Sequence, residues 1–409
     1  MALLDDFVTK EELAETERRV IAHRRAFHEH PELGLKEFET SKYIKSVLNG
    51  LGIENKAMAG TGVLGLIRGT APAADDGPVI VLRADMDALP IEEKTGKPYA
   101  SKCGGVMHAC GHDGHMAVLL GCAEVLNAHR DKLRGTVKLF FQPAEESDGG
   151  AAIMIKEGAL ENPRADYALG MHMAPDFPAG TLAVKYGESY AASDPFDIVI
   201  KGKGAHGAHP EKGIDAILIA AKVLDAIQLV VSRMSSPQKA IVVTVGRIEG
   251  GNIRNQIADR AEMQGIIRTL DNDFRREARE MVRTVAERTA SVYGGSAEVD
   301  IRISYPALQN DDNVVALVER SARDVLGDDH VEVEKYAEMC AEDFAYIAAE
   351  VPSCFMHLGC RSEKEGDAPE LHSAYFDMDE SCLIAGVKVQ INNVLTLIDN
   401  FKRTGRNGR

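Results

Sequence analysis

Residues 79–90, VIVLRADMDALP, decide the fold class of this chain. An unbroken apolar run over 79–82 is followed by charged residues, which include Asp85 and Asp87. A strand that is apolar at every position is buried on both faces, which is typical of a parallel sheet covered by helices. Polar residues that follow such a strand lie at the carboxyl edge of the sheet, where ligands bind in open α/β proteins. The stretch therefore predicts an α/β fold with a polar site at that edge.

Similar runs on either side extend this pattern into a sheet. Four further apolar runs predict strands: VLGLI (63–67), VKLFF (137–141), YALGM (167–171) and SCFMHLG (353–359). Helical patterns lie around them: a first helix from the capping-box pair Thr9 and Glu12 to Pro31, then HMAVLLGCAEVLNAH (115–129), GAAIMIKEGAL (150–160) and NVVALVERSARDVLG (313–327). Alternating buried strands and helices predict a mostly parallel sheet flanked by helices.

A different rhythm begins near residue 190. The segments follow the order strand, helix, strand, strand, helix, strand: FDIVIKG, GIDAILIAAKVLDAIQLVVSRM, AIVVTVGRIEGG, RAEMQGIIRTL, NDFRREAREMVRTVAERTASVYG and AEVDIRISY. This βαββαβ order is that of the ferredoxin-like unit. We therefore expect a small domain, 189–306, inserted into a discontinuous large domain formed by 1–188 and 307–409.

Composition excludes some classes of partner. The chain of 409 residues has a formal net charge of −16, which argues against nucleic acid or an anionic membrane as a partner. No stretch approaches the roughly 20 apolar residues of a membrane span. The first residues carry acids where a signal peptide needs a basic start, so we expect a cytoplasmic protein. The seven cysteines are an odd number and suggest free thiols or metal ligands rather than disulfides.

The densest group of reactive side chains is MHACGHDGHMA, residues 107–117. Cys110 and His112 would not share a face of a helix, but in a loop both can turn toward one ion, and this pair favours zinc. The stretch could instead be a nucleophilic thiol site or only the polar first turn of the helix from His115. His108, His115 and Asp113 are expected to support the site rather than to bind metal.

Polar residues after the other strands extend the site. Adjacent Glu145 and Glu146 cannot both be buried and charged without a cation, so one could bind metal while the other acts as a base. The alternative for this pair is a solvated acidic turn. Asp85 and Asp87 could orient a ligand histidine, or could form a turn with side-chain hydrogen bonds. His172 is a lone histidine, and on its own it indicates little.

Taken together, the motifs resemble a known family. They are FHEHPELGLKEFET, VLRADMDALPI, MHACGHDGHMA, LFFQPAEE, GMHM, GKGAHGAHPEKGIDAI, NIRNQIADRAEMQGIIRT, CAEDFAYI and LHSAYFD, in order along nearly the whole chain. The chain is similar to metal-dependent amidohydrolases such as hippurate hydrolases, N-acyl-amino-acid amidohydrolases and auxin-conjugate hydrolases, within the dinuclear aminoacylases and carboxypeptidases. The resemblance implies that the small domain serves as a lid and as a dimerisation surface.

The resemblance also implies roles for individual residues. It assigns five ligands to two divalent metal ions: Cys110, His112, Glu146, His172 and His372. Glu145 matches the general base, and Asp87 matches the acid that supports the site. His206 matches a lid histidine that reaches a partner subunit's site, and Asn255 and Arg268 match lid positions near the substrate carboxylate.

Two departures from the family pattern stand out. Aminoacylase-type relatives have histidine where this chain has Asp85, so the Cys/His set is expected to hold the metals here. The segment 341–344 reads Ala-Glu-Asp-Phe rather than Ser-Glu-Asp-Phe, which leaves Glu342 without an assigned role.

The implied activity is hydrolysis of N-acyl-L-amino acids, hippurate-like or N-acetylated, to a carboxylic acid and a free amino acid. The implied metal is zinc, with manganese, cobalt or nickel as alternatives. A dipeptidase, a carboxypeptidase or an N-acetyl-diaminopimelate-type deacetylase would use the same site. Two alternatives of another class are a hydrolase with Cys110 as nucleophile and a metal-binding protein without catalysis.

Overall fold

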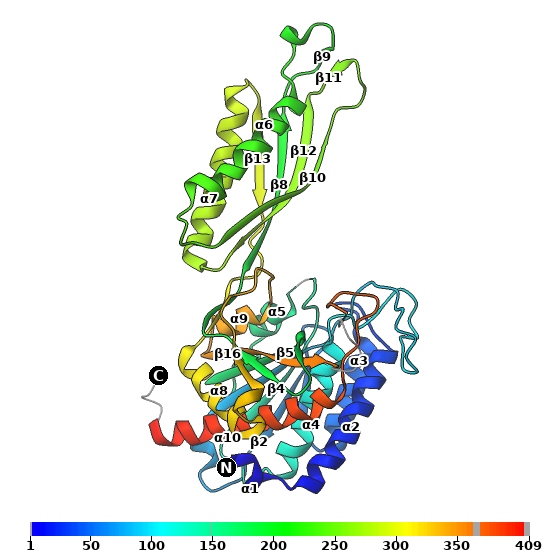
Figure 1. The fold of residues 1–409 in the computed structure, drawn as a ribbon, viewed down its shortest axis with the longest axis vertical. Coiled ribbons are helices and arrows are strands. Elements are labelled where there is room, and N and C mark those ends of the chain that lie inside the picture. The colour runs from blue at the N-terminus through cyan, green and yellow to red at the C-terminus, as the bar shows by residue number, and fades with distance from the viewer. Residues whose placement is uncertain (1, 148, 363–368, 405–409) are drawn as a thin grey trace. The chain divides into compact units, whose positions relative to one another are not determined.

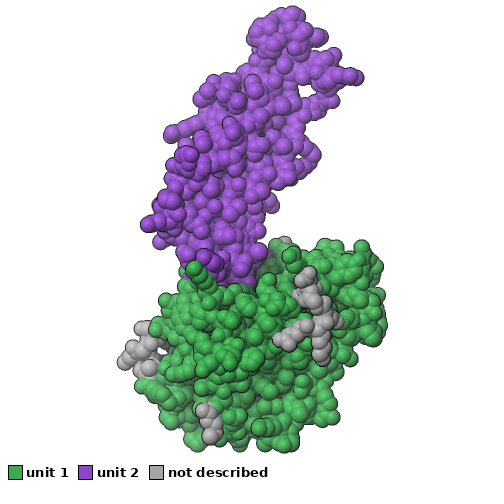
Figure 2. Space-filling model, viewed as in Figure 1, with its two compact units in different colours: residues 1–187, 309–335, 346–409 green, residues 188–308, 336–345 purple. Residues whose placement is uncertain are grey.

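The computed structural model describes residues 2–147, 149–362 and 369–404 (Figure 1). The chain forms two compact units, which Figure 2 colours separately. Unit 1 contains residues 1–187, 309–335 and 346–409, and unit 2 contains residues 188–308 and 336–345. Residues 336–345, which the sequence pattern places in the large domain, thus group with unit 2. Each unit is described by itself below.

Unit 1 is built on an eight-stranded sheet with the order β1-β2-β4-β3-β5-β16-β6-β15. Its strands are β1 (Glu54–Met58), β2 (Gly62–Arg68), β3 (Val79–Asp85), β4 (Thr136–Gln142), β5 (Tyr167–Pro178), β6 (Leu182–Val184), β15 (Val331–Val333) and β16 (Ser353–Arg361). The central neighbours β4, β3, β5 and β16 are parallel, and β1 and β2 continue the sheet antiparallel. All seven residues of β3 are buried. The predicted mostly parallel sheet is therefore confirmed.

The helices of unit 1 cover this sheet. They are α1 (Leu3–Phe7), α2 (Lys10–Glu29), α3 (Phe38–Gly50), α4 (His112–Ala128), α5 (Gly150–Lys156), α8 (Asp312–Leu326), α9 (Phe344–Ala348, which begins in unit 2) and α10 (Ser381–Thr404). The capping box predicted at the start of α2 is present, with reciprocal bonds between Thr9 and Glu12. Helix α4 packs against β3 and β5 and is contacted in turn by α2 and α10, so it is buried on all sides.

Helix α10 corrects the expectation that no stretch of the chain is as long and apolar as a membrane span. Residues Ser381–Arg403 are long and apolar enough to cross a membrane by length and composition. However, 72% of the apolar window is buried inside the protein, as in the core helix of a globular domain. Its buried positions join the core that includes α4 and α8. The apolar character of α10 is thus accounted for by packing within unit 1.

Unit 2 has its own sheet and its own core. The strands β8 (Ala192–Lys201), β10 (Ile241–Gly250), β12 (Arg260–Thr269) and β13 (Ser296–Ile301) form an antiparallel sheet with the order β10-β12-β8-β13. Helices α6 (Ala216–Leu229), which continues into a π-helical turn, and α7 (Asn272–Val292) pack on it. This is the ferredoxin-like arrangement that the segment order predicts. Four short strands form two further two-stranded sheets. Strands β9 (Ala205–His206) and β11 (Gln256–Ile257) lie in unit 2, and β7 (Gly187–Tyr190) and β14 (Leu308–Asn310) each include residues of both units.

Candidate metal centre

The candidate site of unit 1 lies where β3 and β4 end, beside the middle of β5. Strands β4, β3 and β5 are adjacent in the sheet, and β3 and β4 end at Asp85 and Gln142. Asp87 and Glu145 follow these two strands within a few residues, and His172 lies on β5 itself. Because parallel strands share one carboxyl edge, side chains that are distant in the sequence meet there.

The start of α4 brings Cys110 and His112 to this edge. The helix begins at His112, not at His115, and Gly111 precedes it with a φ of 87°. This backbone conformation favours glycine, and a Cβ atom on Gly111 would crowd the side chain of Met173 at 3.0 Å. This left-handed residue turns the chain between the two side chains, which allows both to face β5.

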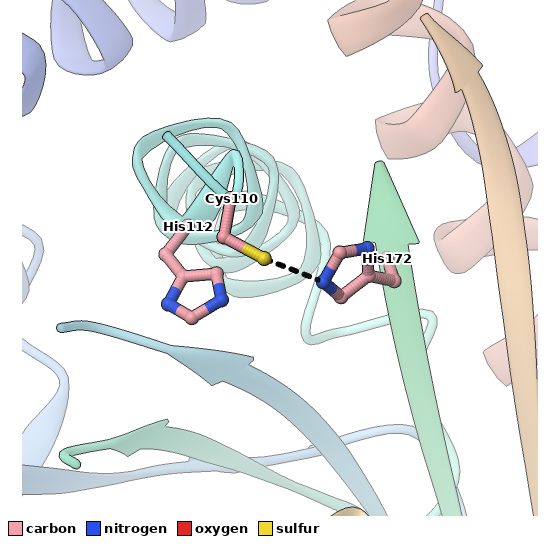
Figure 3. Close-up of side chains that lie close together, drawn as sticks. All are labelled: Cys110, His112 and His172. Atoms are coloured by element: carbon pink, nitrogen blue, oxygen red, sulfur yellow. Dashed lines mark hydrogen bonds between the residues drawn. The ribbon is translucent and has the colours of Figure 1, made fainter. Parts of the chain in front are cut away.

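Cys110 lies between two histidines. Its Sγ is 3.4 Å from Nε2 of His172 and 3.3 Å from Nε2 of His372. Figure 3 shows the sulfur directed at the His172 ring, with His112 beside it. His372 is held by a bond from its backbone amide to the carbonyl of Ala109 and has a φ of 63°, a conformation uncommon outside glycine. Such strain is retained where the surrounding structure enforces it, often at functional sites.

The histidine rings are oriented for metal binding. Nδ1 of His112 lies 2.8 Å from the backbone carbonyl of Asp87, and Nδ1 of His172 lies 2.8 Å from that of Met173. A carbonyl only accepts, so Nδ1 of each ring carries a proton, and Nε2 is the nitrogen that could bind a metal. Nε2 of His112 is buried and has no hydrogen-bond partner among the described residues. A cation is the partner that would satisfy such a nitrogen.

Glu145 and Glu146 lie on a turn whose backbone amides donate hydrogen bonds to two carboxylates, those of Asp87 and Glu37. Asp87 accepts from the amide of Glu145 at 2.9 Å through Oδ1 and from the amide of Glu146 at 3.0 Å through Oδ2. Glu37 accepts from the preceding amide, that of Ala144, at 2.9 Å. Ala144 itself has a positive φ of 55°. Three successive amides are thus fixed, and the two glutamate side chains leave the turn in a set direction.

His115 and Asp85 bind each other and neighbouring groups. Nδ1 of His115 lies 2.5 Å from Oδ1 of Asp85, and Nε2 accepts from the amide of Met173 at 2.8 Å. Both nitrogens of His115 are therefore engaged. The other oxygen of Asp85 accepts from Arg83 at 2.5 Å. This geometry agrees with the supporting role expected for His115.

The electrostatics of the site favour a bound cation. Burial lowers the pKa of His112, but the carboxylates of Asp85, Asp87 and Glu146 outweigh it and raise this pKa to about 10. Nε2 of His112 lies 3.6 Å from Asp85 and 3.9 Å from Glu146. The neighbouring carboxylates thus stabilise a positive charge at this ring, and a bound metal ion would provide such a charge.

Burial, together with Glu146 and Glu145, raises the pKa of the Cys110 thiol well above its ordinary value. A buried thiol in an acidic setting is a poor nucleophile because only the thiolate attacks. A metal ion has the opposite effect, since it deprotonates a coordinating thiol. The surroundings of Cys110 therefore fit a ligand better than a nucleophile.

The ligand atoms form overlapping groups. Several groups of side chains could hold an ion, with all ligand atoms of a group within 4.8 Å; they include Cys110, His112 and His172; Cys110, Glu146 and His372; His112, Glu145 and Glu146; and Asp85, His112 and His115. The first two groups have only Cys110 in common. Thiolate, imidazole and carboxylate together suit zinc and other borderline metals. The residues present therefore fit two neighbouring metal ions.

The other three predicted residues belong to unit 2. His206 on β9 pairs with Gln256 on β11, and the amide of Gly207 donates to the carbonyl of Asn255 at 2.8 Å. His206 and Asn255 are therefore close to each other, and both are exposed. Arg268 lies on β12, where its Nη1 is buried without a hydrogen-bond partner among the described residues.

Sequence reasoning missed Glu37. This residue is fully buried and accepts from both the amide of Ala144 and the hydroxyl of Thr61. It lies in the motif FHEHPELGLKEFET, which is part of the family resemblance, but the resemblance assigns no role to Glu37. A glutamate beside a helix start looks like an ordinary polar residue until its partner across the fold is known.

The fold and the site together define a hydrolytic enzyme of the α/β class with a metal-binding edge. The chain belongs to the peptidase family M20/M25/M40, whose model matches residues 81–394. It is 40% identical over 390 residues to an N-acetyl-L-cysteine deacetylase of Bacillus subtilis, covering 95% of this chain and 90% of that protein. It is also 39% identical to an IAA-amino acid hydrolase (ILR1-like 2) of Arabidopsis thaliana, covering 90% and 82%.

A solved structure extends the comparison to three dimensions. A Bacillus subtilis protein described as a dinuclear metal-binding peptidase of the M20 family matches with a TM-score of 0.81 and 35% identity. The match covers 94% of this chain and 99% of that one. The fold class and the enzymatic character expected from the sequence are thereby confirmed.

Proposed function

We propose that this enzyme hydrolyses the amide bond of N-acyl-L-amino acids with two divalent metal ions. The observation that carries the proposal is the pair of ligand groups that meet at Cys110. Relatives named as an N-acetyl-L-cysteine deacetylase and an IAA-amino acid hydrolase support the substrate class, because both names describe an acyl group on an amino acid.

In this proposal Cys110 belongs to both groups of residues that would hold the two ions. His112 and His172 complete one site, and Glu146 and His372 complete the other, which accounts for all five ligands expected from the resemblance. The orientation of the two imidazole rings through backbone carbonyls supports the first site. The distance of 3.2 Å between Nε2 of His372 and Oε1 of Glu146 supports the second.

The chain's own residues then move the proton. When bound, the ions supply Lewis acidity, which lowers the pKa of a coordinated water toward neutrality. Glu145 accepts the proton of the attacking water and later donates it to the departing amine. Asp87 holds the amide of Glu145 and so sets the direction of the base. A carboxylate that neighbours a ligand on a fixed turn is well placed for this role.

Unit 2 supplies the remaining contacts in this proposal. Arg268 binds the α-carboxylate of the amino-acid half, which would give its buried Nη1 a charged acceptor. Asn255 assists nearby. His206 stabilises the oxyanion of the tetrahedral intermediate in the site of a partner subunit. Unit 2 therefore acts as lid and dimerisation domain, and the enzyme is a homodimer or a dimer-based oligomer.

We further propose that zinc is the resident metal, because a thiolate ligand favours a borderline-soft ion. Manganese, cobalt or nickel would support activity in its place. The enzyme acts in the cytoplasm on small-molecule substrates, with neither nucleic acid nor membrane as a partner.

A substrate panel tests the substrate class. Purified enzyme is assayed with hippurate, a series of N-acetyl-L-amino acids, N-acetyl-diaminopimelate and unblocked dipeptides. The proposal expects the highest kcat/KM on one of the N-acyl-amino acids other than the diaminopimelate derivative. The M20 relative described as a peptidase makes dipeptides the main alternative. A higher kcat/KM on dipeptides would replace the proposal with a dipeptidase.

A further inference from the structure

Two of the candidate ligands, Cys110 and His372, lie in irregular segments of unit 1. One is 107–111, which contains Cys110 and leads into α4, and the other is 369–380, which contains His372 and leads into α10. The backbone bond from His372 to Ala109 joins them directly. The two segments are more than 250 residues apart in the sequence, so their spacing depends on side chains that bridge them.

Arg24 of α2 bridges these segments. Its Nε donates to Oδ2 of Asp113 at 2.7 Å, and its Nη2 donates to Oδ1 of Asp377 at 2.8 Å. Asp113 directly follows the candidate ligand His112, and Asp377 lies five positions after His372. One guanidinium group therefore contacts an acid beside each ligand-bearing segment.

The surroundings make this bridge rigid. The side chains of Arg24 and Asp113 are both 0% exposed, and that of Asp377 is 9% exposed. Arg24 also lies over the ring of Tyr99, whose hydroxyl donates to the second oxygen of Asp377 at 3.0 Å. Buried charges are stable only when paired and hydrogen-bonded, so neither acid can leave the guanidinium without a large cost. Nδ1 of His28 also contacts Oδ2 of Asp113, at 2.8 Å, while Oδ1 of Asp113 is buried without a hydrogen-bond partner among the described residues.

We infer that Arg24 is a positioning residue for the metal centre, which sets the distance between the segment of Cys110 and the segment of His372. The planar fork of arginine donates to two carboxylates at fixed angles, whereas a lysine offers a single point of charge. Arg24 itself touches none of the five candidate ligands. The inference rests on the proposed metal site and adds the residue that holds its two halves together.

The adjacent Arg25 is a matched control. It lies over the same Tyr99 ring and binds Glu380 through two nitrogens, at 2.9 and 2.6 Å. Its side chain is 48% exposed, and the described residues give it no contact with Asp113 or Asp377. Glu380 also accepts from Nη1 of Arg24 at 3.4 Å, so the two arginines share this carboxylate. Replacement of Arg25 leaves the contacts of Arg24 with Asp113 and Asp377 in place.

The test measures the affinity for Zn²⁺ by competition with a chromophoric chelator. The variants are Arg24→Lys, Asp377→Asn and Arg25→Gln, and circular dichroism of each metal-free protein reports whether it is folded. We expect Zn²⁺ binding to weaken about tenfold or more in the first two variants, the scale seen when groups that orient metal ligands are replaced. We expect no change in Arg25→Gln.

Asp377→Asn keeps the inference testable if Arg24→Lys does not fold, because Asp377 is the partly exposed end of the bridge. Wild-type affinity in a folded Asp377→Asn variant, or a loss in Arg25→Gln equal to that in the other two, would overturn the inference. Absence of Zn²⁺ binding by the wild-type protein would instead overturn the proposed metal site, and the inference with it.

Discussion

At the scale of single residues, the hydrogen bonds of each histidine distinguish a candidate metal ligand from a supporting residue. His115 has both nitrogens engaged, whereas His112 has only Nδ1 engaged and presents a bare Nε2. Both histidines lie in one motif, and the sequence predicts His112 as a ligand and His115 as a supporting residue. The separation follows from contacts with the carboxylate of Asp85, at the end of β3, and with the carbonyl of Asp87, two residues further on.

Glu145→Gln tests the base. The amide cannot take a proton from water, so we expect kcat to fall by roughly 100- to 10,000-fold, the usual contribution of a general base. Metal content should stay at the wild-type level, because Glu145 is not among the five proposed ligands. Steady-state kinetics and metal analysis on the same sample check both points. Glu161→Gln, on the surface, is the control. Near wild-type turnover with metals bound would show that another group is the base.

Lys138 gives a prediction on pH and stability. This buried lysine of β4 donates to the carbonyls of Ala159 and Glu161, and burial lowers its pKa from 10.5 to about 8. Between these two pH values the unfolded chain binds more protons than the folded one, so this group makes the free energy of unfolding rise with pH.

The measurement is urea unfolding of wild type and Lys138→Met across the interval from pH 8 to 10.5. The free energy of unfolding of the wild type relative to the variant should increase with pH. A difference that stays constant or decreases would contradict the lowered pKa of Lys138.

At the scale of elements, the turn between β4 and α5 determines where the base points. Glu37 holds the amide of Ala144 and the hydroxyl of Thr61 at 2.5 Å, next to the amides held by Asp87. Removal of this acceptor leaves a buried amide unpaired beside Glu145. The turn thus links a residue near the start of α3 to the proposed proton transfer.

Glu37→Ala should lower the free energy of unfolding by about 1–3 kcal/mol, the cost of a buried unpaired donor. It should also lower kcat, because the turn that carries Glu145 loses one of its fixed amides. Glu37→Gln keeps an acceptor oxygen and should lose less of both quantities. Urea unfolding and kcat measured together are the check, and a stable Glu37→Ala variant with wild-type kcat would disprove the link.

The elements themselves were largely predictable. The runs 63–67, 79–82, 137–141 and 167–171, which are apolar apart from Lys138, all lie on strands, as expected for short buried elements. The start of α4 was placed three residues late, since Gly111 acts through a left-handed φ that composition does not reveal. Glu37 and Arg24 were missed because their partners lie far along the chain.

At the scale of the whole molecule, the proposed dimer has a direct consequence. If His206 acts in the site of a partner subunit, a dimer of one His206→Ala chain and one Glu145→Gln chain contains one complete site. Each variant alone should be nearly inactive. Mixing them under conditions that exchange subunits should restore activity that neither has by itself. Continued inactivity of a mixture shown by native mass spectrometry to contain heterodimers would place His206 in its own subunit's site or outside the reaction.

The central claim is that two metal ions held by five side chains make this chain an amidohydrolase. The most direct measurement is metal analysis of the purified protein, paired with its activity on an N-acyl-L-amino acid before chelation, after chelation and after metal return. We predict two ions per chain, loss of activity on their removal and recovery on their return. Full activity in metal-free protein would contradict the claim.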